Sequence, residues 1–348
     1  MSARPRIALI GCGRIGHVHA ASLATLRDHC ELAMIADPRE DVVRDVAERL
    51  GIPRWSADAE DAIADPAIDA VIVASSTETH APYIETAARH GKDVFTEKPI
   101  ALDIAATDRA LAAVEEAGVR LQVGFQRRFD RGYAAAHQAV AEGSLGRIEM
   151  IRDAMRDPQP PDPGYVAVSG GLYRDMTIHN FDCVRWLMGE EPEEIYATAS
   201  ALVSDDIANA GDVDTSVVTL RFPSGSLATI ENSRRSGFGY DVRTEIFGSA
   251  GAIMVGESRQ TPIRRFSAAG VQEDHQYFFL ERFREAYRQE MDAFLGAILT
   301  DTPVSVTGTD GRAALLMAYA AERSLQERRP VGMDEVLTTY RPQEVPRA

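Results

Sequence analysis

The stretch Arg6–Ile10 (RIALI) followed by Gly11–Gly16 (GCGRIG) decides the fold of the first third of the chain. A short apolar run that ends in a glycine turn and opens a helix is typical of dinucleotide-binding folds. Gly11 permits the tight turn, Gly13 lets a pyrophosphate approach the backbone, and Gly16 lets helix and strand pack closely. The start of the helix would offer unpaired N–H groups and its positive dipole end to the phosphates.

Strand-like and helix-like segments alternate through the rest of the first third. Further strands are predicted at Glu31–Ala36, Ala70–Ala74, Asp93–Thr96 and Arg120–Phe125. Helices are predicted at Ile15–Arg27, Pro38–Leu50, Thr79–His90 and Asp103–Ala117. The run Ala70–Ala74 (AVIVA) is wholly apolar, as in a strand that is covered on both faces. Alternating strands and helices imply right-handed crossovers, so the fold class is α/β with a doubly wound parallel Rossmann sheet.

The pattern changes after about residue 125, where longer alternating runs begin. Two hairpins are predicted: Asp214–Phe222 with Ser226–Ser233 around PSGS, and Thr244–Phe247 with Ala252–Val255 around GSAG. Near the C-terminus, Phe283–Leu299 carries apolar residues at helical spacing and is interpreted as core packing. We therefore predict a Rossmann domain over 1–123 and an α+β domain over 124–348, built on a mostly antiparallel open sheet.

Composition excludes several classes of protein. The chain has 348 residues, with 53 Asp and Glu against 37 Lys and Arg, so its formal net charge is −16. A negative balance argues against nucleic-acid binding, which needs a clustered basic surface. No apolar run is long enough for a membrane span, and the N-terminus lacks the pattern of a signal peptide. Three cysteines without a CxxC pair favour a reducing, cytoplasmic location.

Asp37 lies 21 residues after Gly16, at the end of the second predicted strand. A carboxylate there can accept both ribose hydroxyls of an adenosine and repels a 2′-phosphate, which favours NAD over NADP. Asp37 can equally cap the helix that is predicted from Pro38, and the two roles are compatible. Arg39 complicates the prediction, because an arginine can contact a phosphate.

Two further motifs carry residues suited to acid–base chemistry. Lys98, in Glu-Lys-Pro, follows a predicted strand at the edge where open α/β sheets bind ligands, and Pro99 restricts its backbone. Asp175 and His179 are four residues apart in a predicted helix, Arg174–Met188, so they share a face. A histidine can take a proton from an alcohol while a carboxylate orients it. The alternatives are a solvated lysine, a capping aspartate and a core histidine.

These motifs resemble the glucose–fructose oxidoreductase/inositol dehydrogenase/MocA family over nearly the whole chain. The details most like its inositol 2-dehydrogenase branch are GFQRRFD (124–130), RDPQPP (156–161) and the segment 169–192, which contains DMTIHNFD. Asn180 departs from the pattern, because many relatives in that branch carry Asp there.

The resemblance implies NAD-dependent oxidation of a ring hydroxyl of a cyclic polyol to a ketone, with myo-inositol giving 2-keto-myo-inositol as the first choice. It implies that Lys98 stabilises the developing alkoxide, that His179 accepts the hydroxyl proton, and that Asp175 hydrogen-bonds substrate and tunes the imidazole. Hydride would pass from the carbinol carbon to C4 of the nicotinamide. It also implies a homo-oligomer, commonly a tetramer formed through the open sheet, and no metal.

The remaining site residues are carried over from the same resemblance. Implied substrate contacts are Lys98, Arg128 or its neighbour Arg127, Asp157, Asp175, His179 and Tyr240. Implied cofactor contacts are Gly11, Gly13, Arg14, Ile15, Gly16, Asp37, Ser75, Thr77, His80, Glu97 and Lys98. Alternatives are a turn aspartate for Asp157, a strand aromatic for Tyr240 and a water-bound helix-end histidine for His80. The rival functions are a dehydrogenase of another cyclitol or sugar and a non-catalytic NAD sensor.

Overall fold

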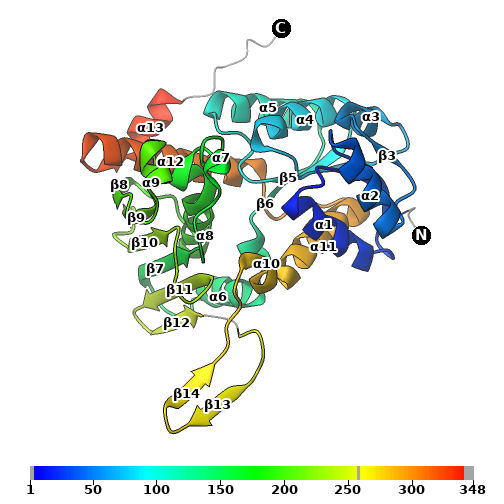
Figure 1. The fold of residues 1–348 in the computed structure, drawn as a ribbon. Helices are drawn as coiled ribbons and strands as arrows, with labels where there is room; N and C mark the ends of the chain where they lie inside the picture. The colour runs from blue at the N-terminus through cyan, green and yellow to red at the C-terminus, as the bar shows by residue number, and fades with distance from the viewer. Residues whose placement is uncertain (1–3, 257–258, 341–348) are drawn as a thin grey trace. The chain divides into compact units, whose positions relative to one another are not determined.

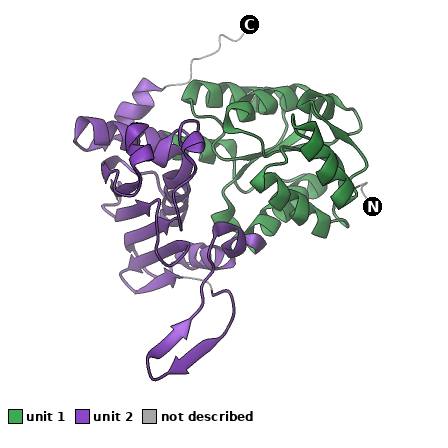
Figure 2. Cartoon of the chain, viewed as in Figure 1, with its two compact units in different colours: residues 1–129, 285–315, 342–348 green, residues 130–284, 316–341 purple. Residues whose placement is uncertain are grey.

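The computed structural model describes residues 4–256 and 259–340, which form two compact units (Figure 2). Of the described residues, the first unit comprises 4–129 and 285–315, and the second comprises 130–256, 259–284 and 316–340. Residues 285–315 therefore pack with the N-terminal part of the chain, although they follow the second sheet in sequence. The division of the chain into consecutive domains after residue 123 remains a prediction.

The first unit is built on a six-stranded sheet with the order β3-β2-β1-β4-β5-β6 (Figure 1). Its strands are β1 Arg6–Ile10, β2 Glu31–Ala36, β3 Trp55–Ser56, β4 Ala70–Val73, β5 Asp93–Glu97 and β6 Leu121–Gly124. All neighbouring strands run parallel, and every residue of β4 is buried. The predicted doubly wound parallel sheet is confirmed. The order reverses between β1 and β4, the point where such sheets bind ligands.

Helices and one 3₁₀ turn complete the first unit. They are α1 Arg14–Thr25, α2 Glu40–Leu50, α3 Ala59–Ala64, α4 Thr77–Arg89, α5 Ile104–Ala117, the 3₁₀ turn Gln126–Phe129 and α11 Arg284–Thr300. Met291 and Phe294 of α11 lie in one buried cluster with Ile72 and Phe95 of the sheet. The predicted core role of the C-terminal helix is confirmed, and it explains why 285–315 belong to this unit.

The second unit is built on a seven-stranded sheet with the order β12-β11-β7-β10-β9-β8-β15. Its strands are β7 Ile148–Arg156, β8 Glu194–Ser200, β9 Thr215–Arg221, β10 Leu227–Ser233, β11 Asp241–Gly248, β12 Gly251–Val255 and β15 Val331–Gly332. Both predicted hairpins, β9–β10 and β11–β12, are confirmed. β10 and β7 pair in parallel, so the sheet is mixed, although its other pairs are antiparallel.

The other elements of the second unit are helical apart from one small hairpin. They are α6 Arg131–Ala141, α7 Pro163–Val166, α8 Ile178–Met188, α9 Asp205–Asn209, α10 Phe279–Arg282, α13 Met333–Thr339, and the hairpin β13 Arg264–Ser267 with β14 Gly270–Glu273. Helix α12 Gly308–Glu327 contributes its first eight residues to the first unit and the rest to the second. Among the described residues, no helix is long and apolar enough to cross a membrane.

Candidate active site

The glycine turn after β1 has the geometry that the motif predicts. Gly11 has a φ of +101°, and a Cβ there would overlap the backbone of Ala74. A Cβ on Gly16 would overlap the carbonyl oxygen of Gly11, so helix and turn approach too closely for any side chain. A Cβ on Gly13, by contrast, would meet nothing within 4 Å. The open surface at Gly13, directly before the first turn of α1, fits the approach of a pyrophosphate.

Asp37 lies immediately after β2 and faces the glycine turn. Its Oδ2 accepts the backbone N–H of Cys12 at 2.7 Å, and its two oxygens accept Nε and Nη2 of Arg39 at 2.8 and 2.9 Å. Burial acts to raise the pKa of Asp37, but the hydrogen bonds from Arg39 and Cys12 outweigh it and lower the pKa. Asp37 is therefore an ionised acceptor at the turn. The cap of α2 is Arg39, and α2 begins at Glu40 rather than at Pro38.

Lys98 follows the end of β5 and is half-buried. The bond between Lys98 and Pro99 is cis. His80, in the first turn of α4, lies behind this segment: its Nδ1 is 2.8 Å from the oxygen of Pro99, and its Nε2 is 3.1 Å from the oxygen of Ser75. Burial lowers the pKa of His80. A neutral imidazole carries one N–H, so His80 donates to one of these two carbonyl oxygens, and its ring links the β4–α4 turn to the Lys98 segment.

Cofactor candidates Arg14 and Ile15 open α1, and Thr77 opens α4, two residues after Ser75 in the β4–α4 turn. Glu97 is the last residue of β5. These residues all lie at the carboxyl ends of β1, β4 and β5. That is the edge of an open α/β sheet at which ligands bind.

The predicted helix Arg174–Met188 has an irregular start. Tyr173–Thr177 form a π-helical turn that leads directly into α8. Asp175 lies in the π turn, and His179 is the second residue of α8 and half-buried. Single π turns inside helices recur at functional sites, because they change the direction of the side chains that flank them.

Arg234 joins two of the predicted site residues, and the sequence analysis did not include it. The residue directly follows β10, is 5% exposed, and its Nη2 donates to Oδ2 of Asp175 at 2.8 Å. Its Nη1 lies 3.5 Å from Oδ2 of Asp157. Tyr165 donates its hydroxyl to Oδ1 of Asp175 at 2.8 Å. Two acids, a guanidinium and a phenol therefore form one polar cluster in the second unit.

The alternation of β10 could have indicated Arg234. Ala228, Ile230 and Asn232 are the buried residues of that strand, and Arg234 continues the same register. An arginine at an inward position needs a carboxylate partner. The burial of Arg234 follows from that period-2 pattern, but the identity of its partners does not.

Asn180 of α8, which departs from the family pattern, belongs to a buried hydrogen-bond network with side chains of β7, β10 and β11. Its Nδ2 donates to Oδ2 of Asp153 at 2.7 Å, and its Oδ1 accepts Nδ2 of Asn232 at 3.0 Å. Thr244 donates its hydroxyl to the other oxygen of Asp153 at 2.7 Å. An ionised Asp at 180 could not donate to Asp153 and would place two carboxylates together, so Asn fits this network.

The weaker substrate candidates lie in less distinctive places. Arg128 forms an ion pair with Asp310 at 3.1 Å in the first unit, and Arg127 beside it is buried. Tyr240 is buried in the second unit, edge-on to Phe279 and Phe283 with ring centroids 6.3 and 6.2 Å away. Tyr240 thus packs as an aromatic core residue, and its contact with substrate stays a prediction.

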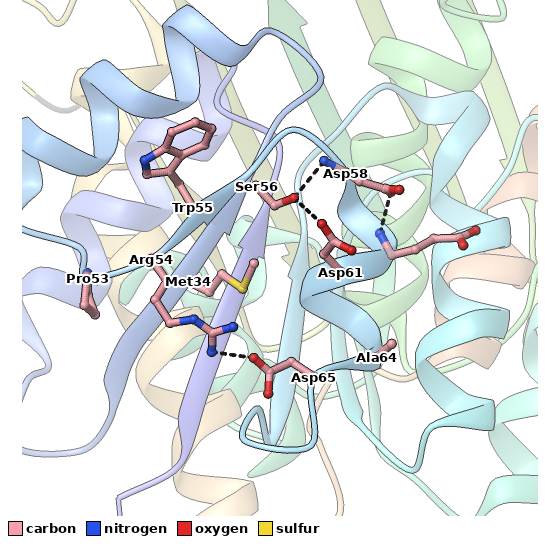
Figure 3. A pocket seen from close by; sticks show the side chains of 10 residues that line it. Met34, Pro53, Arg54, Trp55, Ser56, Asp58, Asp61, Ala64 and Asp65 are labelled. Carbon is pink, nitrogen blue, oxygen red and sulfur yellow. Dashed lines mark hydrogen bonds and ion pairs between the residues drawn. The ribbon is translucent and has the colours of Figure 1, made fainter.

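A hollow of about 950 Å³ lies beside β3 and α3 in the first unit. Figure 3 shows the side chains that line it. Two of its acids have side-chain partners: Ser56 donates to Asp61 at 2.7 Å, and Arg54 forms an ion pair with Asp65. None of the predicted site residues lines it. We therefore assign this hollow no role in the chemistry.

The structure brings the candidates together in two groups. The glycine turn, Asp37, His80 and the Lys98 segment belong to the first unit, whereas Asp157, Asp175 and His179 belong to the second. The convergence of Lys98 with Asp175 and His179 on one substrate stays a prediction.

Two family profiles match the chain. Residues 5–125 match the GFO/IDH/MocA oxidoreductase family described as an NAD-binding Rossmann fold, and residues 133–254 match a GFO/IDH/MocA C-terminal domain. The chain is similar to the myo-inositol 2-dehydrogenase of Thermotoga maritima, with 45% identity over 95% of this chain and 99% of that protein. It is 41% identical to the inositol 2-dehydrogenase of Rhizobium meliloti, over 94% of this chain and 99% of that protein.

A solved structure of scyllo-inositol dehydrogenase from Lactobacillus casei, with bound NAD(H) and scyllo-inositol, has the same fold. The TM-score is 0.88 at 29% sequence identity, over 95% of this chain and 99% of that one. The sequence resemblance is thus confirmed over both halves of the chain, as is NAD as the cofactor. The chain belongs to the GFO/IDH/MocA family of NAD-dependent oxidoreductases.

Proposed function

We propose that the protein oxidises a ring hydroxyl of a cyclic polyol to a ketone with NAD, and that its substrate is myo-inositol, which yields 2-keto-myo-inositol. The observation that carries this proposal is the polar cluster of Asp157, Asp175, Tyr165 and Arg234, whose Asp175 lies four residues before His179 in the chain. A cyclitol presents only hydroxyls, so its recognition needs a lining of donors and acceptors. The names of the relatives described above support the same substrate class.

His179 acts as the general base that takes the proton of the reacting hydroxyl. Asp175 is held by Tyr165 and Arg234, so its carboxylate keeps one position in which it can orient substrate or imidazole. The Lys98 ammonium stabilises the negative charge that develops on the substrate oxygen. These roles require Lys98 to meet His179 at one carbinol, and that convergence is the central claim of the proposal.

The first unit supplies the NAD site. The open backbone at Gly13 and the start of α1 hold the pyrophosphate, and Asp37 accepts the adenosine ribose hydroxyls. Because Asp37 is ionised, the site disfavours a 2′-phosphate, although Arg39 beside it moderates that discrimination. Bound NAD supplies the hydride acceptor. Ser75, Thr77, His80 and Glu97 position the surrounding segments.

Another cyclitol or a sugar is the second candidate. Epimers differ only in the geometry of their hydroxyls, and a site that hydrogen-bonds each hydroxyl rejects an analogue that leaves a buried partner unpaired. The solved relative with bound scyllo-inositol supports this alternative. A non-catalytic NAD sensor is a weaker candidate, because such a protein has no need of Lys98, Asp175 and His179 together.

The test is NADH formation with a panel of myo-, scyllo- and chiro-inositol, pyranoses and an anhydrosugar. We expect kcat/KM to be highest with myo-inositol. Lys98→Ala should lower turnover by about a hundredfold or more and leave NAD affinity nearly unchanged. Turnover of another polyol in preference would replace the substrate, whereas tight NAD binding without any turnover would support the sensor.

The assembly and location are also part of the proposal. The sheet of the second unit exposes apolar side chains on its outward face, which we call the outer sheet face: Met150, Tyr196, Val217, Leu227, Phe247 and Met254. Phe247, Met150 and Leu227 are directly paired across β11, β7 and β10. A second copy of the chain would cover this face, in keeping with a homotetramer. Three buried free cysteines are compatible with a reducing cytoplasm.

A further inference from the structure

Glu290 is a fully buried acid that the proposed chemistry does not use. It lies on α11 of the first unit and is 0% exposed. It continues the apolar stripe of that helix, between Tyr287 and Phe294. Neither of its carboxyl oxygens has a hydrogen-bond partner among the described residues. A buried ionised carboxylate in that state is costly, so the charge of Glu290 must be compensated or removed.

Two other titratable side chains lie close to Glu290, one on β5 and one on α1. Glu97 is the last residue of β5 and directly precedes Lys98, and His19 lies on α1 with 0% exposure. The ligand atoms of the three residues lie within 4.8 Å of one another. Tyr287 of α11 contacts the His19 ring edge-on at 6.0 Å, and the uncharged Gln122 of β6 donates to the backbone oxygen of Glu290 at 2.8 Å.

Either a proton or a cation can balance the two acids. One histidine and two carboxylates are a ligand set that divalent metals accept. However, Nε2 of His19 lies 2.7 Å from Oε1 of Glu97, which is a direct hydrogen bond with no space for an ion between the two atoms. A proton on Glu290 therefore fits the geometry better than a metal. Burial raises the pKa of Glu290 well above its usual value, and the charge of Glu97 adds to that effect.

Glu97 is confined on its other sides as well. A Cβ on Gly124 of β6 would approach Oε2 of Glu97 to 3.1 Å, so β6 lies directly against the carboxylate. His19 and β6 together restrict Glu97, and Glu290 lies beside it. Because Lys98 directly follows Glu97, restricting Glu97 also restricts the backbone of Lys98.

We propose that Glu290 is a protonated positioning residue: its neutral carboxyl lies beside Glu97 without repelling it, so that Glu97 keeps its contact with His19 at the end of β5 and fixes the Lys98 segment. The proposal rests on the proposed function only for the catalytic role of Lys98. The protonation of Glu290 stands independently of any substrate.

The pH dependence of stability follows from this protonation. Folding favours the neutral form of Glu290, so its contribution to stability is complete below the pKa of the unfolded chain, about 4.3 for Glu. That contribution is lost as the pH rises through the raised pKa of the folded state. Gln has the same shape and is neutral at every pH, so Glu290→Gln removes this loss.

The experiment compares the full-length protein with E290Q and with E285Q, an exposed acid on the same helix. Melting temperatures are measured from about pH 5 to about pH 9, across the range above the reference pKa. We expect the difference in melting temperature, E290Q minus wild type, to rise with pH, and E285Q to show no such trend. A pH-independent difference would overturn the proposal, as would a stoichiometric bound metal that E290Q loses.

The positioning role has its own readout. E290Q should keep the kcat of the wild type, whereas E290L, which replaces the polar group beside Glu97 with an apolar side chain, should lower kcat on the order of tenfold with little change in the KM for NAD. Equal kcat values in both variants would refute the positioning role. If no polyol is turned over, the proposed function fails while the pH trend still decides the protonation of Glu290.

Discussion

At the scale of single residues, Arg234 has the clearest consequence, because its buried guanidinium contacts two acids, the buried Asp175 and the half-buried Asp157. Arg234→Gln would leave Asp175 and Asp157 without their cation, and breaking such a buried pair costs about 3 kcal/mol or more. We expect a lower free energy of unfolding in urea and a loss of turnover. Arg234→Lys should lose less stability, since it retains the charge but not the forked geometry.

The matched control is Arg235→Gln, the exposed neighbour of Arg234. Its unfolding free energy should stay within about 0.5 kcal/mol of the wild type. If R234Q were as stable and as active as R235Q, the polar cluster would have no role in holding Asp175.

At the scale of elements, substitutions at two glycines of the turn between β1 and α1 should affect stability and cofactor binding separately. Gly16→Ala places a methyl group against the Gly11 carbonyl, so it should lower the melting temperature. Gly13→Ala meets no protein atom within 4 Å, so it should leave the melting temperature nearly unchanged. The same methyl would occupy the space where the pyrophosphate approaches, and NAD affinity should fall about tenfold or more.

Thermal denaturation and titration of NAD into both variants check this pair. Unchanged NAD affinity in a well-folded G13A protein would mean that the pyrophosphate does not lie at this turn.

At the scale of the whole molecule, the outer sheet face predicts the oligomeric state. Phe247→Glu places a charge in the paired row of Phe247, Met150 and Leu227 and should reduce the molar mass measured by light scattering after size-exclusion chromatography. Leu337→Glu is the control, because Leu337 is 47% exposed on α13 against 48% for Phe247. A protein that is monomeric before mutation, or equal masses for the two variants, would exclude this face as the interface.

The sequence by itself determined the two sheets, the glycine turn, the acid at the end of β2 and the family. These features depend on local periodicity and on backbone conformations that particular residues allow, and short stretches of sequence determine both. The same locality explains small differences, such as the start of α2 at Glu40 rather than at Pro38.

Only the tertiary structure decided which distant side chains meet. Arg234 reaches Asp175 across 59 positions, and Glu290 lies beside Glu97 although they come from a C-terminal helix and an early strand. No local pattern specifies such pairs, because they depend on how strands order in a sheet and which helix covers it. Burial then determines the chemical state of these side chains. Away from water, a charged group needs an opposite charge or hydrogen bonds, and otherwise it becomes neutral.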